Sequence, residues 1–263
     1  MPVDNGLYDR LAGTWWQEES FLGNLRISVN PARVEYLRAV LRLPGWEKNG
    51  LRVLDVGCGG GYLPEALTLF SDQVSGLDAS HGSLVAAHAH ALETGQRIAY
   101  QVGRAESLPF ADGTFDLVTC CDVLEHVDDL DRVLAEIARV LKPGGIFLYD
   151  TINRTFMTWL GVVFVAQEFP PTRFFPAKTH DWRMFIRPEE LTAALSRQGI
   201  INQEIKGLSP AVHPLVHFWL ILKMKRGWLG YRDYGLRTRL HLSRNTAMNY
   251  IGYGVLEGGP RKN

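Results

Sequence analysis

Residues 53–67 read VLDVGCGGGYLPEAL and join an apolar run, an acid, a glycine cluster and a helix-forming segment. Gly57, Gly59, Gly60 and Gly61 follow one another with only Cys58 between them. Glycine allows a tight turn and leaves no Cβ in the path of a ligand. After the first strand of a parallel sheet, such a cluster predicts a binding site at the carboxyl end of that strand. A plain strand-to-helix turn is the alternative explanation.

The chain around this stretch alternates short β-branched runs with helical patterns, which is typical of a parallel sheet covered by helices on both faces. The predicted strands are 53–56, 73–77, 98–102, 115–119 and 146–149, followed by a late antiparallel pair at 202–208 and 248–256. The predicted helices are 63–69, 82–93, 130–141 and 188–198. We therefore expect an α/β fold with a doubly wound, mostly parallel, seven-stranded sheet and a helical lid or insertion.

The domain organisation follows from the same pattern. We expect an N-terminal helical cap over 1–50 and the main domain over 51–263, with a lid segment at 151–187 and an insertion at 210–246. Lys and Arg together number 28, as do Asp and Glu, so the formal net charge is zero. A chain with zero net charge has no long-range electrostatic field that attracts a polyanion, so we expect no nucleic-acid partner.

The cellular setting is indicated by cysteine use and by the absence of targeting patterns. Only Cys58, Cys120 and Cys121 occur, and their spacing fits neither a disulfide framework nor a zinc site. The N-terminal stretch MPVDNGLYDRLAG lacks a basic segment followed by an apolar one. No apolar run approaches the roughly 20 residues of a membrane-spanning helix. We expect a cytoplasmic protein, with contact at a membrane surface as the only membrane association.

The acidic residues near the glycine cluster indicate which kind of ligand binds there. Asp55 stands just before the turn, where a carboxylate repels a pyrophosphate but accepts a hydrogen bond from an ammonium. Asp78 ends the next strand, about 20 residues on, from where an acid binds ribose hydroxyls. Glu106 follows the third strand and faces the place for a base. The third glycine of G-x-G-x-x-G is missing, which disfavours a nicotinamide-dependent oxidoreductase. Together these features describe S-adenosylmethionine.

The motifs VLDVGCGGG, GLDAS, GRAESLPF, FDLVTCCDVLEHV and LKPGG occur in that order. This series resembles the class I S-adenosylmethionine-dependent methyltransferases. The stretches WWQEESFLGNLRISVNPARVEYL, VLEHVDD, INRT and THDWRMFIRPEEL further resemble the ubiquinone-biosynthesis 3-O-methyltransferases. That resemblance implies methylation of a hydroxyl on an apolar catechol or quinol-type molecule. A hydroxyl, amine or thiol of a specialised metabolite, and a cofactor-binding scaffold without turnover, stay open as alternatives.

The resemblance also implies site residues. The family's cofactor contacts fall on Arg33, Gly57, Asp78 and Cys121. Together with the acids and the glycine loop discussed above, we expect the cofactor to be bound by Arg33, Asp55, Gly57, Gly59, Asp78, Ala79, Ala105, Glu106 and Cys121. Arg33 suits the methionine carboxylate, because a guanidinium grips two oxygens at once; a surface charge on a helix is the alternative. Some relatives hold a divalent metal through a pattern like E-x-x-E-H, which here reads Asp122, Glu125 and His126. Magnesium binding at these three residues is therefore an open expectation.

The catalytic candidates are His126, Glu125 and His180. His126 and Glu125 follow a strand's carboxyl end, where an imidazole can accept the proton of a phenol or thiol; a helix cap is the structural alternative. His180 and Asp181 form a second candidate base with an orienting carboxylate, or a loop turn that lines the acceptor pocket.

Two apolar segments remain. The aromatic stretch 155–175 is a core or pocket wall by default, although exposed it would suit a bilayer interface. The insertion is rich in Trp, Lys and Arg, which indicates a lid or a surface for anionic lipid.

Overall fold

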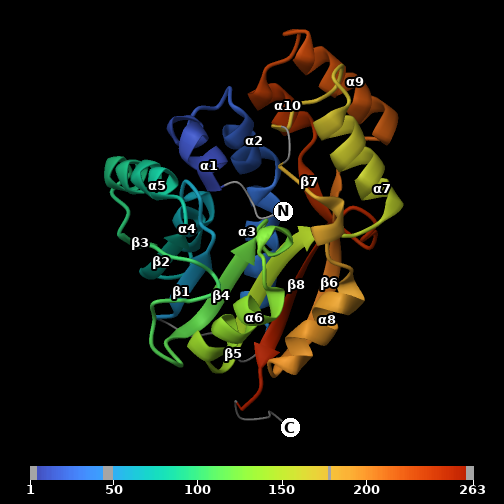
Figure 1. The fold of residues 1–263 in the computed structure, drawn as a ribbon. Coiled ribbons are helices and arrows are strands. Elements are labelled where there is room, and N and C mark those ends of the chain that lie inside the picture. The colour runs from blue at the N-terminus through green and yellow to red at the C-terminus, as the bar shows by residue number, and fades with distance from the viewer. Residues whose placement is uncertain (1–4, 44–49, 177–178, 259–263) are drawn as a thin grey trace.

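The computed structural model describes residues 5–43, 50–176 and 179–258 (Figure 1). Its centre is one eight-stranded sheet in the order β3-β2-β1-β4-β5-β8-β6-β7. The strands are β1 (Arg52–Val56), β2 (Gln73–Asp78), β3 (Ile98–Val102), β4 (Phe115–Cys121), β5 (Leu141–Ile152), β6 (Ile200–Pro210), β7 (Leu240–Ser243) and β8 (Asn249–Leu256). The first five pair in parallel, and the strand order reverses direction between β1 and β4. In open α/β sheets, ligands bind at this switch point, beyond the carboxyl ends of the strands.

The predicted doubly wound sheet is confirmed, and the late pair β6 and β8 is antiparallel as expected. The expected number of seven strands is wrong, because β7 within the insertion pairs antiparallel with β6 and makes an eighth. Leu240 and Leu242 alternate with polar residues in RTRLHLSR and pack against the core. This short alternation is the pattern of a half-buried strand.

Helices cover both faces of the sheet (Figure 1). On one face, α6 (Leu130–Val140) and α8 (Pro188–Arg197) bury their apolar stripes. On the other face lie α3 (Asn30–Leu41) and α4 (Tyr62–Leu67). The helix α5 (His81–Glu93) follows β2. In α6, Asp129 caps the first turn by accepting from the N–H of Arg132, and Val133, Ile137 and Val140 repeat at helical spacing on the buried side.

A further layer lies beyond the carboxyl ends of the parallel strands. It contains α1 (Asn5–Leu11), the 3-10 turn η1 (Ala12–Thr14) and α2 (Phe21–Ser28). The insertion adds α9 (Pro214–Lys225) and α10 (Tyr231–Arg237). Gly235 lets α10 approach α2 closely, because a Cβ there would lie 2.4 Å from Oδ1 of Asn24. The N-terminal helices and the insertion therefore pack on each other (Figure 1).

The segment after β5 contains α7 (Phe156–Thr158), the π-helix η3 (Trp159–Glu168) and the 3-10 turn η4 (Trp182–Met184). Over the described residues, none of the helices is both long and apolar enough to cross a bilayer.

Candidate cofactor and active site

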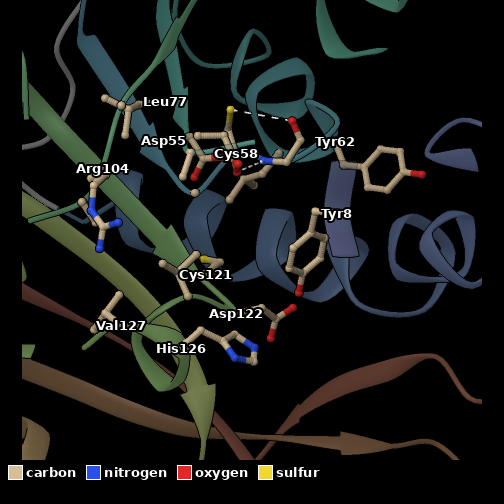
Figure 2. A pocket seen from close by; sticks show the side chains of 18 of the residues that line it. Tyr8, Asp55, Cys58, Tyr62, Leu77, Arg104, Cys121, Asp122, His126 and Val127 are labelled. Atoms are coloured by element: carbon tan, nitrogen blue, oxygen red, sulfur yellow. Dashed lines mark hydrogen bonds between the residues drawn. The ribbon is translucent and has the colours of Figure 1, made fainter. Parts of the chain in front are cut away.

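A cavity of about 390 Å³ lies at the carboxyl ends of β1 and β4 (Figure 2). This volume falls within the range of small-molecule sites. Every residue expected to bind the cofactor lies in its wall: Arg33, Asp55, Gly57, Gly59, Asp78, Ala79, Ala105, Glu106 and Cys121. Asp122 and His126 also line it.

The glycine loop is shaped for close approach to the cavity. Gly57, Gly59 and Gly61 have φ values of 73°, 52° and 89°, a region that side chains rarely adopt. The N–H groups of Gly57 and Cys58 both donate to the carbonyl of Leu77, at 2.7 and 3.0 Å. The turn therefore needs glycine for its backbone conformation and is tied to the end of β2.

Aromatic side chains from the N-terminal layer cover this loop. A Cβ on Gly60 would lie 2.3 Å from Cγ of Trp15, so the indole packs directly on the backbone. The Trp15 Nε1 donates to Oγ of Ser83 at 3.0 Å, and the Trp16 Nε1 donates to the carbonyl of Gly60 at 2.9 Å. The cap thus closes one side of the cavity.

The two acids predicted on β1 and β2 are held in different ways. Asp78 accepts from the N–H groups of Gly59 and Ser80, both at 2.8 Å. Burial raises the pKa of its carboxyl, which these two hydrogen bonds oppose. Asp55 is buried and accepts from Oγ1 of Thr119 at 2.6 Å. Burial raises its pKa to about 7, so its charge depends on a cationic neighbour.

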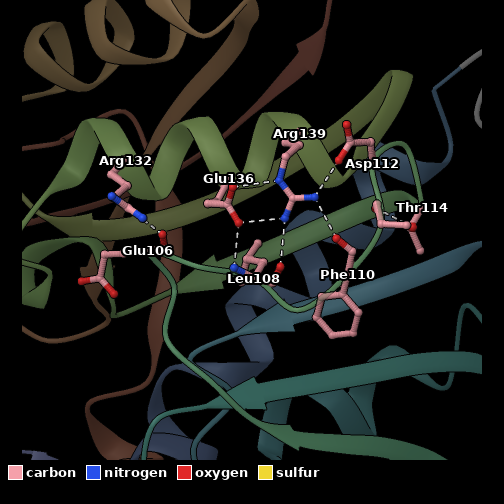
Figure 3. A network of polar contacts seen from close by, with 9 residues as sticks. Glu106, Leu108, Phe110, Asp112, Thr114, Arg132, Glu136 and Arg139 are labelled. Atoms are coloured by element: carbon pink, nitrogen blue, oxygen red, sulfur yellow. Dashed lines mark hydrogen bonds and ion pairs between the residues drawn. The ribbon is translucent and has the colours of Figure 1, made fainter.

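The loop with Ala105 and Glu106 is clamped from outside by α6 (Figure 3). Arg132 Nε donates to the carbonyl of Glu106 at 2.9 Å. Arg139 Nη2 donates to the carbonyl of Leu108 at 2.9 Å, while Glu136 Oε2 accepts from the N–H of Leu108 at 2.7 Å. These bonds fix the cavity wall opposite the N-terminal cap.

Arg33 lies in the wall with its guanidinium already paired. Its Nε and Nη2 donate to the two oxygens of Asp150 at 2.5 and 2.9 Å. Nη2 also contacts Oδ2 of Asp122. The methionine carboxylate, which we expect Arg33 to bind, would therefore have to compete with the carboxylates of Asp122 and Asp150. Burial opposes the charge of Asp122, but Arg33 nevertheless holds its pKa below the ordinary value.

The expected metal set does not form. The described residues contain no group of three or more His, Cys, Asp or Glu side chains suited to a metal ion. Asp122 is paired with Arg33, and Glu125 is buried with Oε2 accepting from Oγ1 of Thr151 at 2.8 Å. Burial, reinforced by Asp122, raises the pKa of Glu125 to about 8, so this carboxyl is largely protonated at neutral pH. The residues do not fit magnesium.

Of the three catalytic candidates, only His126 reaches the cavity. Burial lowers its pKa to about 4, which keeps the imidazole neutral at pH 7. Glu125 and His180, the other two catalytic candidates, do not line this cavity, and their catalytic roles stay predictions. His180 packs behind His126 with ring centroids 5.3 Å apart. Its expected partner Asp181 is paired instead with Arg183.

The sequence analysis missed several wall residues. Tyr8 and Trp15 come from the N-terminal layer and Asn30 from the start of α3, and nothing local in their sequence indicates that they line the cavity. Asp150 is not a wall residue, but it pairs with Arg33, which is one. It lies near the carboxyl end of β5, so the rule that selected Asp55 and Asp78 could have found it.

Known proteins resemble this chain in sequence and in fold. A family model described as a methyltransferase domain matches residues 54–149. A ubiquinone biosynthesis O-methyltransferase from Nitrosococcus oceani is 35% identical over 97% of this chain and 95% of its own length. One from Burkholderia pseudomallei is 36% identical over 79% of this chain and 86% of its own.

Two solved structures share the fold. The YcgJ protein from Bacillus subtilis has a TM-score of 0.60 and 20% identity, over 86% of this chain and 98% of that chain. A possible histamine N-methyltransferase from Thermotoga maritima has a TM-score of 0.60 and 17% identity, over 95% and 98%.

The sheet, the glycine loop and these comparisons define a class I S-adenosylmethionine-dependent methyltransferase. Within that class, the chain belongs to the family of the ubiquinone biosynthesis O-methyltransferases. The nicotinamide-dependent alternative is thereby excluded.

The residues present fit the cofactor of this class. Gly57, Gly59 and Asp78 line the same cavity, and the left-handed turn keeps side chains off the two glycine positions. A Cβ at Gly57 would lie 2.2 Å from Cγ2 of Val123. Asp78 suits ribose hydroxyls, Asp55 suits an ammonium, and Arg33 suits a carboxylate.

Proposed function

We propose that this methyltransferase methylates a hydroxyl group on an apolar aromatic molecule of the catechol or quinol type. The observation that carries the proposal is the position of the His126 imidazole in the wall of the cofactor cavity, in the turn that follows β4. The similarity to relatives named for ubiquinone O-methylation supports the same substrate class.

The chain's own residues then have distinct tasks. The bound cofactor supplies a methyl group already activated by a positive sulfur. The substrate oxygen forms the new C–O bond with one of its electron pairs, and the electrons of the broken C–S bond stay on sulfur. His126 accepts the phenol proton. The N-terminal layer, with Trp15 over the glycine loop, positions the reactants and excludes water.

Incubation with S-adenosylmethionine and a panel of acceptors tests the proposal. The panel should contain 3,4-dihydroxy aromatics with and without an isoprenoid chain, matched monophenols, an aromatic amine and an aromatic thiol. We expect an O-methyl product from the catechols, with better turnover for the prenylated one. Methylation of only the amine or the thiol, or cofactor binding without any product, would contradict the proposal.

Replacement of His126 with glutamine is expected to lower kcat by about 100-fold or more, because general bases contribute on this scale. The dissociation constant for the cofactor should change little. The loss should shrink as the pH approaches the ordinary phenol pKa of about 10, since solution base then supplies the phenolate. His88→Gln, an exposed position on α5, is the matched control. Wild-type kcat across this pH range would exclude the role of His126.

We also propose a cytoplasmic enzyme that contacts an anionic membrane surface. The rings of Phe156, Trp159, Phe164 and Phe169 form a row with successive centroids 5.6, 6.1 and 5.8 Å apart, and all four are exposed. On α9, Leu215 is 72% and Trp219 55% exposed. Both segments lie on the same side of the molecule (Figure 1).

The charge of the insertion supports lipid rather than a neutral apolar partner. Its basic residues are Lys223, Lys225, Arg226, Arg232, Arg237, Arg239 and Arg244, against the single acid Asp233. Exposed apolar side chains beside basic ones are typical of surfaces that bind anionic bilayers.

Sedimentation with vesicles tests this contact. Wild-type protein is expected to bind vesicles with an anionic phospholipid, and to bind less at high salt. Leu215→Ser/Trp219→Ser should weaken this binding by about tenfold, because two apolar side chains leave the interface. Leu92→Ser, at an equally apolar exposed position on α5, should not. Equal binding by all three proteins would contradict the proposal.

A further inference from the structure

The two carboxylates that hold Arg33 differ in their surroundings. Asp150 receives two hydrogen bonds from the guanidinium, and its side chain is 2% exposed. Asp122 receives one, and its side chain is 34% exposed. Figure 2 shows the Asp122 carboxylate on the cavity side, between the hydroxyl of Tyr8 and the imidazole of His126. Asp150 is therefore a fixed partner of Arg33, and Asp122 is an exchangeable one.

The backbone holds Asp122 in place independently of that ion pair. Its φ is 54°, which makes it the single non-glycine residue with positive φ in the part of the chain that the structure describes. Its N–H donates to Oδ1 of Asp150 at 3.0 Å. A strained residue at the end of a strand is a pointer to function. Asp122 can thus give up Arg33 and still stay at the cavity wall.

The charges of the cavity favour such an exchange. The wall contains the acids Asp55, Asp78, Glu106, Asp122 and Asp128, against the arginines Arg33 and Arg104. A ligand carboxylate on Arg33 would be a third anion around one guanidinium, and it would repel the two already there. Asp122 is the more exposed of the two partners, so it is the one that can move away from Arg33. Once released, its carboxylate needs a cation.

We propose that Asp122 makes the site prefer S-adenosylmethionine to S-adenosylhomocysteine, by leaving Arg33 to the ligand carboxylate and attracting the positively charged sulfur of the cofactor. This inference rests on the cofactor binding that the proposed function requires. S-Adenosylhomocysteine has the same carboxylate and ammonium, but its sulfur is an uncharged thioether. The product therefore loses the attraction of Asp122, and its release is favoured.

The ratio of two dissociation constants tests the role of Asp122. Calorimetry should give the dissociation constants of both ligands for the wild type and for Asp122→Asn. Asparagine tolerates the left-handed conformation, so the backbone is preserved. The preference for S-adenosylmethionine should fall by about tenfold, since a partly screened charge interaction is lost. Any effect through Arg33 acts on the carboxylate common to both ligands and cancels in the ratio.

The control is Asp128→Asn, which removes another acid of the same wall. It should leave the ratio near that of the wild type. An unchanged ratio in Asp122→Asn, or an equal fall in both variants, would overturn the inference. Should Asp122→Asn fail to fold, Asp122→Gly removes the carboxylate and relieves the strain at the same φ. Failure of the wild type to bind either ligand would instead count against the proposed function.

Discussion

Replacement of Arg33 with methionine is expected to lower the free energy of unfolding by about 3–5 kcal/mol at pH 8, because it leaves a buried carboxylate without its partner. Asp150 is buried and accepts two hydrogen bonds from this guanidinium. Burial already raises the pKa of Asp150 while Arg33 opposes that shift. Without Arg33 the pKa of Asp150 rises further, so the folded protein holds this buried carboxyl in its uncharged, protonated form.

The pH dependence follows from this direction. A carboxyl whose pKa is higher in the folded than in the unfolded protein favours folding below about pH 4, and this contribution is lost as the pH rises through the folded value. The difference between wild type and Arg33→Met should therefore be larger at pH 8 than at pH 5 in urea unfolding. Arg38→Met, at an exposed position on α3, controls for the substitution itself.

A double variant separates charge from packing. In Arg33→Met/Asp150→Asn the buried charge is gone, so part of the lost stability should return, and the pH dependence should weaken. A deficit that is the same at both pH values, with no recovery in the double variant, would mean that Arg33 acts through packing alone.

The fold was predictable where local pattern and tertiary environment agree. The parallel strands are short, apolar and bounded by turns, so β1 to β4 were found with their ends nearly correct. β7 was missed because its four residues lie in an insertion dominated by helical apolar stretches. β5 begins at Leu141, earlier than expected, since Leu141 already pairs with Phe115 of β4, and the register shifts before Ile146 pairs with Leu117.

The site residues, too, were predictable only in part. All the expected cofactor residues lie around the cavity. Except for Arg33 on α3, they lie at or after strand ends, which the sheet brings together. Their binding roles stay predictions. Glu125 and His126 are neighbours in sequence, but one side chain turns to Thr151 and the other to the cavity. Tyr8 and Trp15 reach the site only through the packing of the N-terminal layer, which no local pattern indicates.

Gly57→Ala is expected to abolish measurable cofactor binding and to destabilise the protein by about 2–5 kcal/mol. The left-handed backbone at φ 73° costs a residue with a Cβ about 1–2 kcal/mol. The Cβ would also lie 2.2 Å from Cγ2 of Val123, an overpacking that costs about 1–3 kcal/mol more. Calorimetry with S-adenosylmethionine and urea unfolding measure the two effects.

Two further variants separate the causes. Gly95 has a φ of 70° and no atom within 4 Å of a Cβ, so Gly95→Ala carries the conformational cost alone. Gly57→Ala/Val123→Ala removes the contact and should recover the overpacking share of the lost stability. If Gly57→Ala is no less stable than Gly95→Ala and still binds the cofactor, then Val123 moves aside freely. The loop would then need glycine only for its backbone conformation, and the close packing of Val123 against it would contribute nothing to the site.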